Sequence, residues 1–217
     1  LVSMERSEVF RPGFLDMLKA GGTVILANTA GVVLGLNNKT ETIGSLSGGG
    51  SSGGNVTLGS GTLITGRDGT STLFGGAITG TGSVNKIGNG VLTLSGATSF
   101  SGELNIFGGG VVLARAGGNT LGDTSNVLIG SGGANLTVNS SDTIGRLTTL
   151  ANTTLTIGSG TTLTSNHAAL ADTVRAGKVA AGTNGTRVMI VNGGTEGLVP
   201  GMVVKAQDGN SDLLEGT

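Results

Sequence analysis

The sequence predicts an all-β protein in which short strands wind into a column of stacked coils, a parallel β-solenoid with short non-repeat caps at both ends. Three observations predict this fold. The chain repeats itself internally, its glycines are unusually frequent, and short runs of strand-forming residues recur about every 20 residues. Because stacked repeats form a scaffold, function has to come from groups on the surface.

The internal repeat lies in two stretches about 100 residues apart. Glu-Thr-Ile-Gly-Ser-Leu at 41–46 returns as Asp-Thr-Ile-Gly-Arg-Leu at 142–147, and Leu-Gly-Ser-Gly at 58–61 returns as Ile-Gly-Ser-Gly at 157–160. Such self-similarity is typical of a stacked architecture.

Glycine dominates the composition, with 44 of 217 residues, yet the chain has no Gly-X-Y period and only Pro12 and Pro200. Collagen is therefore excluded. Val, Ile and Leu recur throughout and the mean hydropathy is +0.25, which is too apolar for a disordered chain. The glycines are therefore predicted to form turns.

Charge and missing residue types exclude several functions. The formal net charge is −1, from 12 basic and 13 acidic side chains, and the chain has no Tyr or Trp. A nucleic-acid partner is not expected, because the chain has no basic stripe and almost no aromatic surface for bases. With no cysteine, disulfides and thiolate metal sites are excluded, and no apolar run is long enough for a transmembrane helix.

From residue 21 to 165, runs of Val, Leu, Ile and Thr are broken every four to eight residues by Gly, Asn or Ser. This texture predicts strands. The predicted strands are 23–26, 32–36, 42–46, 55–58, 62–65, 71–74, 77–79, 91–94, 103–106, 111–113, 126–129, 135–138 and 153–157. Leu92-Thr93-Leu94 is one of several runs that alternate apolar and polar residues, which predicts one side chain inside and the next facing water.

Apolar positions recur about 20 residues apart, which predicts one coil per repeat. The predicted stacked pairs are Leu58 with Ile78, Val84 with Leu104, Leu92 with Val112, and Val138 with Ile157. At ~4.8 Å per coil the body forms ~7 coils and a rod ~34 Å long. A β-sandwich is the rival fold, but it normally fills its core with large aromatics, and this chain has only five Phe.

The two ends depart from the repeat and define three predicted regions. Residues 1–20 form an N-terminal cap or arm, in which Phe14 to Leu18 follow Pro12 with the spacing of a short amphipathic helix. Residues 21–165 form the parallel β-helix repeat body. Residues 166–217 form a C-terminal cap or lateral subdomain, with a possible helix over 167–179 and strands over 187–191 and 202–205.

Residues 76–113 carry a dense pattern of Gly, Leu and Ser. Within it stand Lys86, Leu92, Leu94, Ser95, Gly96, Phe100, Ser101 and Gly102. These residues match a Gly-x-Gly-Ser-Leu-x-Lys-x-Gly-x-Gly-x-Leu-x-Leu-Ser-Gly segment followed by an aromatic-Ser-Gly corner, so the stretch resembles the autotransporter-associated β-strand repeat. Val84 replaces the usual Leu, and Phe100 replaces the commoner Tyr.

Companion elements extend the resemblance over most of residues 21–165. They are Thr-Ile-Gly-x-Leu at 42–46 and 143–147, and Leu-Gly-Asp at 121–123. The resemblance implies a right-handed parallel β-helix, extracellular or on the bacterial cell surface, often as one part of a longer passenger or filament-forming protein. It names no catalytic residues.

Candidate chemical groups are few. His167 is the single histidine, so no catalytic triad or paired-His metal site is expected, and a turn or cap role is predicted for it. The acids of the repeat body are Asp68, Glu103, Asp123 and Asp142, which are far apart in sequence and fall at turns or strand ends. With no Tyr or Trp to stack on sugars, a polysaccharide-degrading enzyme is the remote alternative.

Glycine-rich segments suggest neither calcium nor phosphate binding. Gly-Ser-Gly-Gly at 130–133 and Gly-Arg-Asp-Gly at 66–69 lack the repeated Asp of calcium-binding nonapeptides. Gly80-x-Gly82 and Gly88-x-Gly90 do not lead from a strand into a helix, so positive-φ turns are predicted instead. We therefore expect no catalytic, cofactor-binding or metal-binding residues and no cofactor.

A non-enzymatic structural role remains. The hypothesis is a β-solenoid building block of a bacterial surface filament, sheath or stalk, which forms a homo-oligomer or homopolymer through its dissimilar ends. The alternative is an autotransporter-like adhesin segment that binds host or matrix glycans or proteins.

Overall fold

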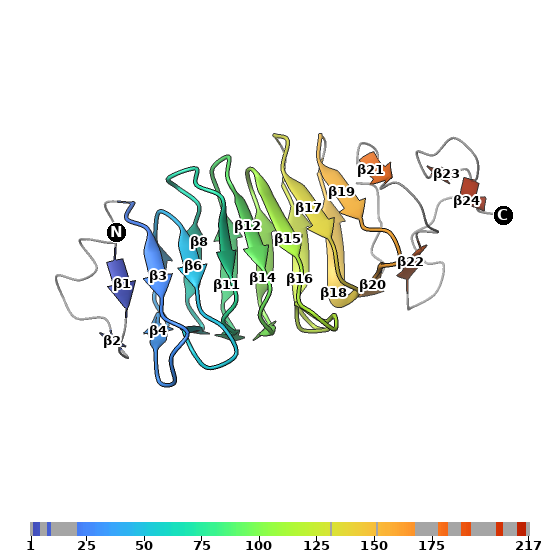
Figure 1. Cartoon of the computed structure of the whole chain (residues 1–217). Helices are drawn as coiled ribbons and strands as arrows, with labels where there is room; N and C mark the ends of the chain where they lie inside the picture. The colour runs from blue at the N-terminus through green and yellow to red at the C-terminus, as the bar shows by residue number, and fades with distance from the viewer. Residues whose placement is uncertain are drawn as a thin grey trace.

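The computed structural model describes residues 21–130, 132–150 and 152–167, together with the backbone pairing of six short strands nearer the two ends. The described residues form a column of stacked coils (Figure 1). Three sheets run along this column, and every pairing between their strands is parallel.

The first sheet has nine strands. In sheet order these are β1 (Val2–Met4), β3 (Val24–Leu26), β6 (Leu46–Gly48), β9 (Thr72–Phe74), β12 (Val91–Leu94), β15 (Gly110–Leu113), β17 (Asn135–Val138), β19 (Thr154–Ile157) and β21 (Lys178–Ala181). The second sheet has five: β2 (Glu8–Val9), β4 (Val33–Gly35), β7 (Asn55–Gly59), β10 (Ile78–Gly80) and β13 (Thr98–Phe100).

The third sheet has eight strands. These are β5 (Glu41–Thr42), β8 (Thr62–Thr65), β11 (Ser83–Lys86), β14 (Glu103–Ile106), β16 (Asn126–Ile129), β18 (Asp142–Thr149), β20 (Thr162–His167) and β22 (Val188–Val191). The chain visits the three sheets in turn as far as β14 and only the first and third sheets from β15 onward, and each circuit is one coil. From β3 to β20 it completes about seven coils, which confirms the parallel β-solenoid and contradicts the sandwich.

Coil length varies, and this variation makes two of the four predicted stacked pairs wrong. Val84 lies beside Leu104, and Val138 beside Ile157, as predicted. Ile78, however, pairs with Val56 instead of Leu58, and Leu92 pairs with Val111 instead of Val112. Loops of different length between strands shift the register, so a fixed spacing cannot locate every partner.

The two copies of the hexapeptide repeat differ in secondary structure, but in both the glycine is bonded to the preceding coil. Residues 41–46 lead from β5 of the third sheet into β6 of the first, so the predicted strand over 42–46 is wrong: it is a bend between two strands. Residues 142–147 lie within β18, which the sequence did not predict as a strand. In both corners the glycine N–H donates to a carbonyl of the preceding coil, Gly44 to Gly22 and Gly145 to Ser125.

Along the strands, side chains alternate between the core and the surface. Leu92 and Leu94 of β12 are buried, whereas Thr93 between them is partly exposed, as the sequence predicted. The core is a continuous column of Val, Leu and Ile, into which Phe74 and Phe100 also point fully buried side chains. Small aliphatic residues fill the narrow space between the sheets without larger rings.

Glycine is required at corners for two different reasons. Gly80 and Gly88 have φ angles of +127° and +68°, so these two are the positive-φ turns that the sequence predicted. Gly82 and Gly90 do not adopt positive φ, so the prediction is wrong for these two; a Cβ on Gly82 would collide with the carbonyl oxygen of Gly61, and one on Gly90 with that of Thr70, in the coil before. Gly102 lies over Gly82 in the same way, so backbone stacks directly on backbone at this corner.

The sheets continue beyond residues 21 and 165. β1 pairs with β3 and β2 with β4, while β21 pairs with β19 and β22 with β20.

The helix predicted over 167–179 is wrong at its ends, because His167 closes β20 and residues 178–179 open β21; residues 168–177 lie outside the described part. The strands predicted over 187–191 and 202–205 are confirmed as β22 and β23 (Val203–Lys205), which pairs antiparallel with β24 (Asp212–Glu215). The helical face predicted at Phe14 to Leu18 also lies outside the described residues.

Substitutions at Leu94 and Thr93 test the inside and outside assignment. Leu94→Asp places an unpaired charge in the core and should cost about 4 kcal/mol or more, whereas Thr93→Asp should change stability by less than about 1 kcal/mol. Urea unfolding followed by circular dichroism measures both. Equal tolerance at the two positions would contradict the assignment.

Gly102→Ala tests the stacking of backbone at the corner, with Gly122→Ala as the matched control. An alanine at 102 pushes its methyl group against the Gly82 carbonyl and should cost about 2 kcal/mol. At 122 the nearest atom to the new methyl would be 3.4 Å away, an ordinary contact, so stability should be unchanged or slightly higher. Thermal melts of the two variants give the comparison, and an equal loss in both would remove the stacking argument.

Candidate binding surface

Lys86, the lysine of the repeat motif, lies inside the column. Its side chain is 1% exposed, and its ammonium group donates to the carbonyl oxygens of Ile87 (2.7 Å), Gly88 (3.1 Å) and Gly108 (3.2 Å). Burial lowers its pKa below the usual value, while the nearby Asp68 carboxylate acts in the opposite direction. Lys86 therefore supplies donors to corner carbonyls of two coils and presents no charge to a ligand.

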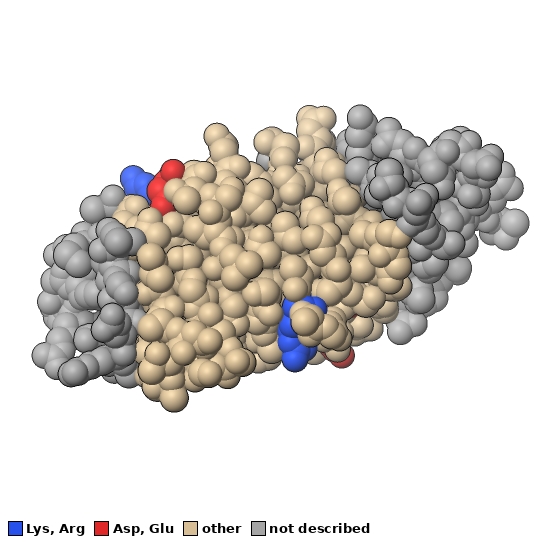
Figure 2. Space-filling model, in the orientation of Figure 1, with Lys and Arg blue, Asp and Glu red and all other residues tan. Residues whose placement is uncertain are grey.

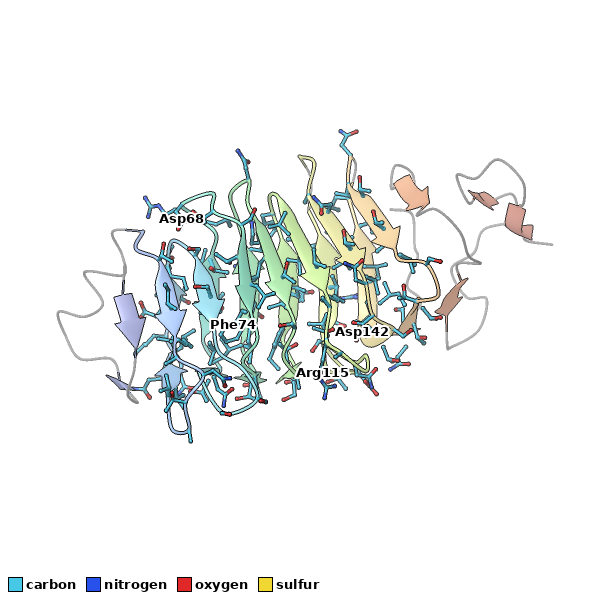
Figure 3. All side chains as sticks on the ribbon, in the orientation of Figure 1. Asp68, Phe74, Arg115 and Asp142 are labelled. Atoms are coloured by element: carbon cyan, nitrogen blue, oxygen red, sulfur yellow. The ribbon has the colours of Figure 1, made fainter. Side chains whose placement is uncertain are left out.

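Asp68 joins three coils at the edge of the column (Figure 3). Its Oδ2 accepts hydrogen bonds from the hydroxyls of Ser45 (2.8 Å) and Thr23 (3.1 Å), and its Oδ1 accepts from the Thr70 N–H (2.9 Å). Burial alone would raise the pKa of Asp68, but these hydrogen bonds favour the carboxylate and hold the pKa below its ordinary value. The Asp68 carboxylate therefore links three coils, since both of its oxygens accept hydrogen bonds within the protein.

The side chain of Asp142 accepts backbone N–H groups at a place where the neighbouring coil has no strand. Residues 120–122 form no strand in the second sheet, and the Oδ2 of Asp142 instead accepts the N–H groups of Thr120 (2.8 Å) and Leu121 (3.2 Å). The carboxyl is 3% exposed and its Oδ1 has no partner within the protein. Burial raises the pKa of Asp142 to about 6, although the two N–H donors favour the ionised form.

The four predicted acids do not assemble into an active site. Asp68 and Asp123 lie in turns, while Glu103 and Asp142 are the first residues of β14 and β18. Within the described residues, no group of three or more His, Cys, Asp or Glu side chains is placed to hold a metal ion. The backbone of His167 lies beside that of Arg146 at the end of β20, so this residue is in a strand and not in the predicted turn.

The described part of the chain contains no helix with the length and apolarity that a membrane crossing requires. The face of the column drawn in Figure 2 carries charged side chains at only a few places. On the outward side of the first sheet, Leu73, Thr93, Val112, Thr137 and Thr156 follow one another from coil to coil, and none is charged.

Three large apolar side chains stand out from the described surface: Leu73, 56% exposed, Phe107, 48%, and Leu150, 37%. Phe107 and Leu150 both follow strands of the third sheet, β14 and β18. The sequence did not predict that Phe107, one of five Phe, is exposed. The alternation in Glu103 to Phe107 was the available signal, since Leu104 and Ile106 had to face the core.

Comparison with known proteins finds a similar autotransporter segment. The chain is 47% identical over 91 residues to the Adhesin BmaC autotransporter of Brucella suis biovar 1 (strain 1330). The aligned segment is 41% of this chain but only 3% of that protein. No family model matches the chain, and no solved structure matches it significantly.

The relative and the solenoid together fit an autotransporter passenger β-helix. The resemblance inferred from the Lys86 and Leu92 motif is thereby supported by a named autotransporter. Because the aligned part spans 3% of that relative's length, the match describes a segment of passenger β-helix and not the activity of a whole protein.

Asp142 should make the stability of the column depend on pH. Its folded-state pKa of about 6 lies above the ordinary 3.8, so its stabilising contribution is complete below pH 3.8 and is lost as pH rises through 6. Acidification from pH 7.5 to 5 should therefore raise the free energy of unfolding by about 1.4 kcal/mol. Asp142→Asn should remove this dependence, and Asp123→Asn, at an exposed turn, should retain it.

Urea unfolding at pH 5, 6 and 7.5 measures this effect. Asp68, whose pKa lies below its ordinary value, loses its stabilising contribution only as pH falls below about 4, outside the tested window. A wild-type stability that stays constant between pH 5 and 7.5 would contradict the assignment to Asp142.

Proposed function

We propose that the chain is a non-enzymatic coil segment of an autotransporter adhesin at the bacterial surface, serving as a rigid stalk that carries ligand-binding side chains. The 47% identity with an autotransporter named as an adhesin carries this proposal. It favours the adhesin alternative over the filament building block as the primary role.

The absence of an enzyme site belongs to the same proposal. The buried acid Asp142 and the buried base Lys86 are bonded to backbone groups, and Asp68 is bonded to Ser45 and Thr23. A general acid or base must direct a free lone pair or proton toward a substrate, and the Oδ1 of Asp142, which has no partner, belongs to a side chain that is only 3% exposed. These side chains instead stabilise the corners, which supports a binding and structural role.

Rigidity follows from the continuity of the hydrogen-bonded sheets. Each strand from β3 to β19 in the first sheet is bonded to a coil before and a coil after it, and the core runs uninterrupted from Val24 to Leu163. Bending the column requires several ladders to break together. Such a rod suits an adhesin that must hold its ligand-binding residues away from the cell.

Adhesion and microscopy of the purified chain test the proposal. The protein should appear as separate short rods in electron micrographs, and it should bind host cells or extracellular-matrix preparations in a saturable manner. The doubly destabilised variant Leu94→Asp with Gly102→Ala is the control for dependence on the folded column.

Each outcome has a distinct meaning. Filaments formed by the intact chain, with no cell or matrix binding, would overturn the adhesin role and favour end-to-end assembly. Rods that bind neither cells nor matrix would also contradict the proposal. Saturable binding lost in the destabilised control supports it.

A further inference from the structure

The outward side chains of the third sheet form a regular grid across successive coils. Strand pairing places Asn85 of β11 beside Asn105 of β14, and Asn105 beside Leu128 of β16. Neighbouring coils are ~4.8 Å apart, and outward residues within one strand are ~6.8 Å apart. Phe107 follows Asn105 by two residues, just after β14 ends, so the next outward position along this side of the column is an aromatic residue.

Phe107 has a glycine, Gly130, beside it on the next coil. The Gly130 N–H donates to the Ile106 carbonyl, which brings residue 130 alongside 107. A Cβ built on Gly130 would stand 3.0 Å from Cδ1 of Phe107, so the ring occupies the space where a side chain at 130 would be. The ring is nevertheless 48% exposed, and it presents its outer side to solvent.

The same corner continues the apolar surface to both sides. The Phe107 N–H donates to the Lys86 carbonyl, and the Leu150 N–H donates to the Ile129 carbonyl, so Ile87, Phe107 and Leu150 occupy equivalent corner positions. Ile87 is partly exposed and Leu150 is 37% exposed. Ile87 lies one coil before Phe107, and Leu150 lies two coils after it with Gly130 between them, so the three apolar side chains form a narrow ridge along the column axis that a glycine interrupts.

Amides next to the ridge carry hydrogen-bonding groups that the protein does not fully use. The Asn105 Nδ2 donates to Asn85 Oδ1 at 3.0 Å. The Asn105 side chain is 9% exposed, and its Oδ1 has no hydrogen-bond partner within the protein. A buried amide oxygen without a partner is costly, and a small rotation of this side chain would offer it to a donor at the surface.

Charges around these residues balance. Glu103 is the first residue of β14 and Arg146 is an exposed residue within β18; they have opposite signs and precede the ridge positions 107 and 150 along the chain. Arg67 and Asp68 follow Gly66, two coils before Phe107, and again have opposite signs. Lys86 is buried and directed to backbone carbonyls. The surface therefore favours an uncharged ligand over an anionic one.

We propose that Phe107, Asn105 and Asn85 form a binding site for neutral glycans. The site rests on the proposed adhesin function and names its ligand class. The C–H groups on the apolar face of a sugar ring are slightly positive and pack against the negative face of the Phe107 ring. Sugar hydroxyls both donate and accept, so they satisfy the Asn105 oxygen and the free amide hydrogens of Asn85.

An apolar protein partner fits these residues less well. It would bury the amides of Asn85 and Asn105 against carbon and leave the Asn105 oxygen still unpaired, which costs free energy. A sugar combines one apolar face with a rim of hydroxyls, which is the combination that this ridge and its neighbouring amides require.

Binding of the full chain to chemically defined neutral oligosaccharides, galactose- and mannose-containing, tests the proposal by surface plasmon resonance. A dense display of the sugars compensates for weak single-site affinity. Phe107→Ala should weaken binding about tenfold, and Phe107→Tyr, which keeps the ring, should bind as the original chain does.

Leu73→Ala is the matched control, because Leu73 is also a large exposed apolar residue but lies in β9 on the first sheet. It should leave glycan binding unchanged, and circular dichroism melts should show that all three variants fold. Asn105→Ala should also weaken binding, since it removes the amide beside the ring.

Three results would overturn the glycan site, and they bear differently on the adhesin function. If Phe107→Ala and Leu73→Ala bind the sugars equally, Phe107 is not the platform. If the chain binds cells or matrix but no neutral oligosaccharide, adhesion stands and the glycan inference fails. If binding to a glycoprotein persists after its sugars are removed, the partner is protein.

Discussion

Hydrogen bonding of each coil to the next is the constraint on which the rest of this structure depends. The parallel ladders of three sheets hold successive backbones about 4.8 Å apart over the described column. At that distance, inward positions must carry residues that stack on copies of similar size, such as Val84 on Leu104. Corners must bring backbone against backbone, which is why Gly82 and Gly102 cannot carry a Cβ without displacing a neighbouring carbonyl.

Corners also create the polar groups that have to be satisfied inside the column. Where the chain bends, carbonyl and N–H groups leave the ladders, and three charged side chains meet them. Lys86 donates to three carbonyls, Asp142 accepts two N–H groups, and Asp68 links hydroxyls of two earlier coils. These three charged side chains are bonded to backbone and hydroxyl groups of the column, and the raised pKa of Asp142 predicts that the stability of its corner depends on pH.

Sequence alone predicted the solenoid, the alternation of strands such as Leu92 to Leu94, and the approximate number of coils, because these depend on local pattern and on stacking distance. It could not predict register, since loops of unequal length move Ile78 onto Val56. It also missed the candidate site. Phe107 and Asn105 are ordinary in the linear sequence and become neighbours of Asn85 and Gly130 only after coils of different length are stacked. The roles of Lys86 and Asp142 depended on burial, which the pattern around them did not reveal.

The division between inward and outward positions explains how one scaffold can carry different binding properties. Inward residues and corner glycines are held by contacts with two neighbouring coils, so their replacement affects the column. Outward residues such as Thr93 and Phe107 alternate with them along the same strands and carry little of that packing. A Cβ at 130 would stand 3.0 Å from the ring of Phe107, so the glycine at 130 leaves room for that ring, and the ladder between β14 and β16 lies next to both residues. Because ligand-binding residues of this kind can change without altering the stack, the fold persists while its surface chemistry varies.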